Sequence, residues 1–157
     1  MIDLSEIVLR LGAAALIGGM IGLNRDIHHK PSGLRTLALV GLGAALAVMI
    51  AAAASTGPNP LTPVIQGVLT GIGFLGAGVI VHEEANQKVH GLTTAAAIWL
   101  TACLGCACGA GLWSQALVSA AFVAFILIFG GRIEKAVHQR LKGGDRSNDT
   151  GDQSNQT

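Results

Sequence analysis

Charged and aromatic residues are scarce in this sequence of 157 residues. Asp, Glu, Lys and Arg make up 12% of it, aromatic residues make up 4%, and tyrosine is absent. Hydrophobic residues instead reach 51%. A soluble domain of this length exposes too large a share of its surface to water to hide so much apolar area. A formal net charge of +1 also provides no basic surface for nucleic acid. The composition therefore excludes an ordinary soluble domain and gives no sign of a nucleic-acid partner.

Groups that carry chemistry are also few. The three cysteines, Cys103, Cys106 and Cys108, lie in one apolar run with no histidine close by, so small apolar packing is favoured over a disulfide framework or a zinc site. No Asp or Glu lies in the interior of an apolar run, where Mg²⁺ would need oxygen ligands. No nucleophile–base pair or phosphate-binding motif has a suitable context. We therefore expect no enzyme, no cofactor and no metal site.

What the sequence has is five apolar runs, at residues 7–23, 36–54, 64–81, 93–112 and 114–130. A helix needs about 20 mostly apolar residues to cross a bilayer. Backbone groups in lipid must pair internally, and the runs lack the alternation of strands, so helices are predicted. The fold class is all-α: a polytopic membrane domain over residues 1–131 with close, glycine-rich packing. Ser32 is expected to cap the second helix. Residues 132–142 are expected to form an amphipathic segment on the cytoplasmic membrane surface, followed by a disordered tail, 143–157.

The positions of Lys and Arg predict the orientation. Nine of the ten lie in three segments: the connector 24–35, the connector 82–90, and the residues after the fifth run. With five spans these segments share one side, which the positive-inside rule makes the cytoplasm. The N-terminus is then outside and the C-terminus inside. Arg10 is the exception, and Glu6, four residues earlier, is expected to pair with it at the outer interface.

Glycine is plentiful, with 22 residues, and it clusters within the runs. Small residues let membrane helices approach closely. In the third run glycines occupy two opposite faces, so this helix is predicted to be central. The helix-packing candidates are Gly18, Gly22, Gly67, Gly71, Gly73, Gly76, Gly78, Gly105 and Gly109. The alternative is that GIGFLGAG, at 71–78, interrupts the helix and lines a path for an ion or substrate, as in some transporters.

Charge concentrates in GLNRDIHHKPSGLRT, residues 22–36. This connector and the one at 82–90 both flank the third span on the same side, so we expect them to be neighbours. One interpretation is a simple topology signal with solvated counterions. The other is a cytoplasmic polar patch that binds an anion, a metal or a protein. Arg25 and Arg35 are the better candidates for such a patch, because they lie at the ends of spans where packing can hold them.

Three blocks, GMIGLNRDIHHKPSGLRTLALVGLGAAL, GIGFLGAGVIV and VHGLTTAAAIWLTACLGCACGAG, occur in this order. They resemble the MgtC/SapB (SapB/YhiD) family of bacterial inner-membrane proteins over roughly residues 6–130. The resemblance implies about five spans and a link to low magnesium and to virulence. It also implies a membrane partner, since members are reported to restrain the ATP synthase. Members often carry a soluble cytoplasmic domain after the spans, where this sequence has a polar tail.

The family motifs select a candidate functional patch: Arg25, Asp26, Gly33, Arg35, Thr36, Thr93 and Thr94. Two positions depart from the family pattern. Asn24 stands where an acid commonly precedes the first arginine, and Thr93 stands where a virulence-linked member has Asn. The sequence thus predicts a regulatory protein of magnesium homeostasis that acts through contacts within the lipid bilayer, with a second copy of itself as another expected partner. The alternative is a small oligomeric transporter or channel for magnesium or protons.

Overall fold

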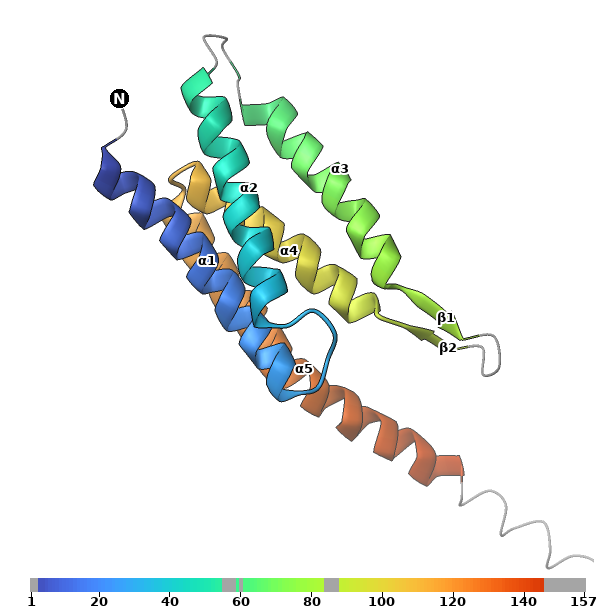
Figure 1. The fold of residues 1–157 in the computed structure, drawn as a ribbon. Helices are drawn as coiled ribbons and strands as arrows, with labels where there is room; N and C mark the ends of the chain where they lie inside the picture. The colour runs from blue at the N-terminus through green and yellow to red at the C-terminus, as the bar shows by residue number, and fades with distance from the viewer. Residues whose placement is uncertain (1–2, 55–58, 60, 84–87, 146–157) are drawn as a thin grey trace, which may run out of the picture. The chain divides into compact units, whose positions relative to one another are not determined.

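The computed structural model describes residues 3–54, 59, 61–83 and 88–145, and these form five helices and one pair of short strands (Figure 1). The elements are α1 (Leu4–Ile27), α2 (Leu34–Ala54), α3 (Leu61–Val79), β1 (Val81–Glu83), β2 (Lys88–His90), α4 (Leu92–Gly109) and α5 (Trp113–Asp145). All five helices are long and apolar enough to cross a membrane. The predicted all-α, five-span architecture is confirmed.

The connector after α3 differs from the prediction. The third span was expected to stay helical to residue 81, but α3 ends at Val79 and an antiparallel pair of strands follows. Val81 pairs with His90 and Glu83 pairs with Lys88. A ladder satisfies backbone groups that a plain loop would leave to water. Short strands of three residues carry too little alternation to be recognised from sequence.

The interior is built from α1, α2 and α4, which contact one another pairwise. More than half of the apolar window of α4 is buried (56%), against 6% for α3. Of the residues of α3, Gly76 alone is buried, and it faces Ala95 of α4. The prediction that the third helix is central is therefore wrong. Glycines on two faces indicate where neighbours can approach, whereas the neighbours themselves are decided by the tertiary arrangement.

Close backbone approach holds the three interior helices together. A Cβ added at Gly18 of α1 would overlap the carbonyl of Leu37 in α2, and one added at Gly105 of α4 would overlap the carbonyl of Gly41. A Cβ at Gly109 would lie 2.9 Å from the Cα of Ala45. Such contacts leave no room for a side chain. These glycines therefore set the distances between the helix axes.

The remaining interior is small and apolar. Ala44, Val48, Ala102 and Cys106 form one buried cluster between α2 and α4. The hydroxyl of Thr101, also buried, donates to the carbonyl of Ala97 at 2.7 Å. This bond to the preceding turn satisfies the hydroxyl without a partner from another helix.

A polar anchor forms where α1 begins, as the sequence predicts. The side chain of Asp3 accepts from the backbone N–H of Leu4 at 2.9 Å and so caps α1. Arg10 Nε donates to Glu6 Oε1 at 2.8 Å, which confirms the predicted pair. Arg10 Nη1 also donates to the carbonyl of Gly109 at 2.9 Å. A cation therefore satisfies the C-terminal end of α4, where helix carbonyls lack partners.

The chain divides into two units, residues 1–123 and 124–157, which are described separately. In the second unit, residues 124–145 are helical, and the rings of Phe125 and Phe129 lie 4.8 Å apart. The predicted segment 132–142 is thus helical, while its position on the membrane surface stays a prediction. Positions 143–145 belong to α5 rather than to a disordered tail, and residues 146–157 lie outside the described part of the chain.

Candidate functional site

Arg25 lies in the last turn of α1 and is 2% exposed. Its Nε and Nη2 donate to the carbonyl of Pro31 at 3.2 and 3.0 Å. Nη2 also donates to the hydroxyl of Thr94, a buried residue in the first turn of α4. A cation suits the C-terminal end of a helix, where the macrodipole is negative. Arg25 therefore ties the end of α1 to both the connector and α4.

Asp26, the next residue, performs the capping that the sequence assigned to Ser32. Its Oδ2 accepts from the backbone N–H of Leu34 at 2.9 Å, so it caps α2 from eight residues away. Ser32 instead has a positive φ of 63°. The prediction of a Ser32 cap is therefore wrong, because the connector folds back on α1 and brings the carboxylate to the helix start.

Gly33 is required at this cap. A Cβ built there would overlap the carboxylate of Asp26. A neighbouring glycine, Gly22 of α1, would place its own Cβ 2.6 Å from the carbonyl of Gly33. The connector therefore packs tightly between α1 and the start of α2, and a side chain fits neither at position 22 nor at position 33.

The predicted functional patch therefore separates into two groups. Arg25, Asp26, Gly33 and Thr94 are brought together, and their described bonds position the ends of α1, α2 and α4. The other three members of the predicted patch, Arg35, Thr36 and Thr93, are exposed. Thr94 at the start of α4 meets Arg25 at the end of α1, whereas the expected proximity of the connectors 24–35 and 82–90 stays a prediction.

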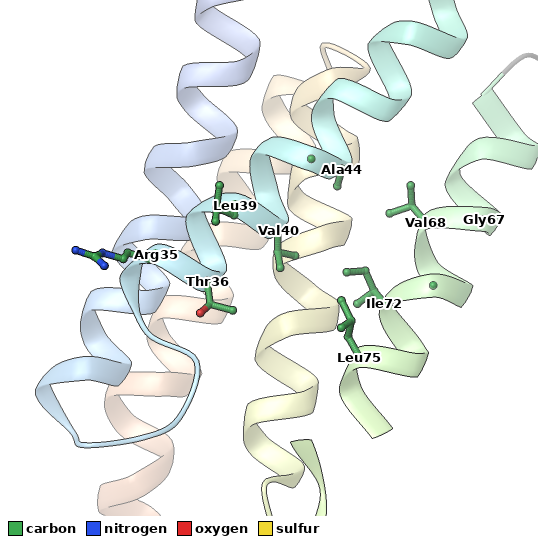
Figure 2. A pocket seen from close by; sticks show the side chains of 11 residues that line it. Arg35, Thr36, Leu39, Val40, Ala44, Gly67, Val68, Ile72 and Leu75 are labelled. Carbon is green, nitrogen blue, oxygen red and sulfur yellow. The ribbon is translucent and has the colours of Figure 1, made fainter. Parts of the chain in front are cut away.

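Two of these three exposed patch residues, Arg35 and Thr36, border a groove between α2 and α3 of about 560 Å³ (Figure 2). The groove, called the α2–α3 groove below, lies between positions 35–44 of α2 and 67–75 of α3. Its walls are aliphatic, with Leu39 and Val40 on one side and Ile72 on the other. The groove is apolar and open along its length, and one cationic residue, Arg35, lies at its end.

Several predicted packing glycines do not pack within the described chain. A Cβ built at Gly67, Gly71, Gly73 or Gly78 meets no described atom within 4 Å. Gly67 and Gly71 line the α2–α3 groove. Gly18, Gly22, Gly105 and Gly109, by contrast, lie directly against other backbones. Spacing alone does not separate these two kinds of glycine, because the same GxxxG pattern suits a neighbour from any chain.

The side of α3 turned away from the interior carries polar and small residues. Gln66, Thr70, Gly73 and Ala77 are exposed and follow one another at intervals of three or four residues, which defines one face, called the outer face of α3 below. The hydroxyl of Thr70 donates to the backbone carbonyl of Gln66 at 2.8 Å. The helix itself is continuous from Leu61 to Val79. The interrupted backbone that the transporter alternative requires at 71–78 is therefore not found.

Two structural residues are absent from the candidate site residues predicted above. Gly41 packs against the carbonyl of Ala14, and the signal for it is the small pair Gly41 and Ala45, four residues apart. Gly91, the residue directly before α4, has a φ of 94°, and a Cβ there would overlap the carbonyl of Val79. A glycine directly before a helical run is a usable signal for such a left-handed start. In the described part of the chain, no group of three or more His, Cys, Asp or Glu is placed to hold a metal ion.

Five helices long and apolar enough to span a membrane, three of them in close contact at glycines, define a small polytopic α-helical membrane protein. The model of the MgtC family matches residues 11–136, and the chain belongs to this family. It is 43% identical to Protein SrpB of Synechococcus elongatus over 75% of this chain and 71% of that protein.

Two further relatives carry the family's name. The chain is 46% identical to Protein MgtC of Brucella abortus over 72% of its length, and 44% identical to Protein MgtC of Salmonella typhimurium over 71%. It spans about half of each of these two proteins, 46% and 47% respectively. No solved structure matches the chain.

Proposed function

We propose that this chain is a regulatory protein of the bacterial inner membrane that serves adaptation to low magnesium by binding another membrane protein. It acts by contact rather than by catalysis. Membership in the MgtC family supports the magnesium role. In this proposal the N-terminus is outside and the C-terminus cytoplasmic, which is supported by the distribution of Lys and Arg.

The proposed binding surface for the partner is the outer face of α3. Gln66 is an exposed amide on a helix whose other polar side chains are the hydroxyls of Thr62 and Thr70. A polar group that faces hydrocarbon without a partner costs several kcal/mol. A neighbouring helix removes this cost by hydrogen bonding, and Gly73 and Ala77 let its backbone come close. α3 is free for this role because it contributes so little to the interior.

The partner is another membrane protein, with the ATP synthase suggested by the resemblance, or a second copy of the chain. A photo-reactive residue at position 70 should capture it in native membranes, whereas one at position 12 in α1 should not. Gln66→Leu should reduce capture about ten-fold, since interhelical hydrogen bonds contribute about 1–2 kcal/mol. Gln115→Leu, which changes an exposed glutamine at the start of α5, is the matched control.

Growth and flux separate this proposal from the transporter alternative. A strain that needs the protein in low magnesium should grow poorly with Gln66→Leu while the variant still inserts. Purified protein in liposomes should move neither Mg²⁺ nor protons. Robust flux that disappears in Gly73→Leu would overturn the proposal. Normal growth with Gln66→Leu would show that the outer face of α3 is not the binding surface.

A further inference from the structure

The α2–α3 groove combines an apolar channel with a cation at one end. Its walls are aliphatic, and three glycines, Gly43, Gly67 and Gly71, leave it open because no side chain fills their positions. We propose that this groove binds the acyl chain of an anionic phospholipid, with the lipid phosphate at Arg35. This site lies apart from the outer face of α3 and goes beyond the proposed function.

The length of the groove fits one leaflet. Its α2 wall extends from Arg35 to Ala44, nine steps of a helix that rises 1.5 Å per residue, or about 14 Å. A bilayer core is about 30 Å thick, so one leaflet is about 15 Å deep. Figure 2 shows Arg35 and Thr36 at one end of this wall and Ala44 toward the other. An acyl chain that enters at Arg35 therefore reaches the far end near the bilayer midplane.

Charge selects the lipid. Arg35 is exposed and lines the end of the groove, and in Figure 2 its side chain points to the side of α2 away from α3. It reaches a phosphate at the mouth of the groove by a change of rotamer, which its exposure permits. A guanidinium binds phosphate oxygens in a bidentate manner, and the hydroxyl of Thr36 is a further donor at the same end. Cations near the membrane surface favour anionic lipids. A transmembrane helix would fill the apolar part of the groove but would offer no phosphate to Arg35.

Lipid titration of the purified full chain in detergent, followed by native mass spectrometry, tests the proposal. The probes are palmitoyl-oleoyl phosphatidylglycerol and the matching phosphatidylcholine. A cation near the headgroups contributes about 1 kcal/mol, so wild type should bind phosphatidylglycerol about five-fold more tightly. Arg35→Gln should bring this ratio close to one, and Arg35→Lys should retain most of it. Gly71→Leu should weaken binding of both lipids, because its side chain fills the groove.

Two control variants make the result specific. Lys30→Gln removes a cation from the same connector but outside the groove, and should keep the five-fold preference. Gly12→Leu adds the same bulk to α1 at another glycine whose Cβ position is open, and should keep the affinity. Equal binding of the two lipids by wild type would overturn the proposal. An equal loss of the preference for phosphatidylglycerol in Lys30→Gln and Arg35→Gln would also overturn it. A Gly71→Leu variant with changed oligomeric mass and unchanged lipid binding would assign the groove to a helix and overturn the lipid site.

Discussion

The guanidinium of Arg25 donates a hydrogen bond to the hydroxyl of Thr94, and this bond joins the last turn of α1 to the first turn of α4. Sixty-nine positions separate the two residues in the chain. Both side chains are buried, and the same guanidinium also holds the carbonyl of Pro31. One cation thus fixes two helix ends and the connector between α1 and α2.

Thr94→Val should destabilise the protein, because it removes an acceptor and leaves a charged donor buried. Hydrogen bonds to charged groups contribute about 1.5–3 kcal/mol, so the free energy of unfolding should fall by about 2 kcal/mol. Unfolding in mixed micelles by increasing dodecyl sulfate, followed by helical circular dichroism, measures the change. Thr94→Ser keeps the hydroxyl and should stay close to wild type. If the exposed neighbour Thr93→Val lowered stability equally, the bond to Arg25 would not be the cause.

Gly33→Ala should remove the cap of α2, because the new Cβ takes the space of the Asp26 carboxylate. Loss of a capping residue costs about 1 kcal/mol, and Asp26→Ala should show a similar loss. The double variant should then lose little more than either single one, since both changes remove the same interaction. Gly43→Ala, in α2 and facing open space, is the control. Full additivity in the double variant would contradict the assignment of Asp26 as the cap.

Gly105→Ala should destabilise the interior, whereas Gly78→Ala should not. A Cβ at position 105 would overlap the carbonyl of Gly41 and lie 2.9 Å from the Cβ of Ala44, while one at position 78 meets no described atom within 4 Å. Overpacking of this kind costs about 1–3 kcal/mol. The same unfolding measurement applies to both variants. Equal stability of the two would show that α2 and α4 can separate without cost.

Arg35→Ala should impair growth in low magnesium without affecting insertion or stability. Its side chain is exposed, and surface changes of this kind alter stability by no more than about 0.5 kcal/mol. The defect would therefore report lost function rather than lost folding. The measurement is growth of a strain that depends on the protein, with Lys30→Ala as the matched control. Normal growth with Arg35→Ala would show that the protein does not need Arg35 for its function.

A fluorescent protein fused to the C-terminus should fold and fluoresce in the cytoplasm. Nine of the ten Lys and Arg residues lie in segments that five spans place on the side of the C-terminus. An alkaline phosphatase fusion at the same point should be inactive, because that enzyme works outside the inner membrane. The opposite pair of results would reverse the proposed orientation and move Arg35 to the outer leaflet.

The number and type of the elements followed from the sequence. Apolar length predicts a helix because lipid offers the backbone no other partner, and all five apolar runs are helical. The pairing of Glu6 with Arg10 was also predictable, since residues four apart on a helix are neighbours whatever surrounds them. Family motifs placed Arg25, Asp26, Gly33 and Thr94 in a patch of seven residues, but indicated neither what each one contacts nor that the other three are exposed.

Tertiary structure decided the position of each helix, the residue that caps α2 and the burial of each arginine, because these depend on which distant segments meet. Both α3 and α4 contain a glycine pair four residues apart, yet α4 lies in the interior and α3 at its margin. Asp26 rather than Ser32 caps α2, because the connector folds back on α1. The sequence by itself determined five membrane helices and their charged connectors. Only the packed structure separated the arginine that joins helix ends, Arg25, from the one left exposed at the end of a groove, Arg35.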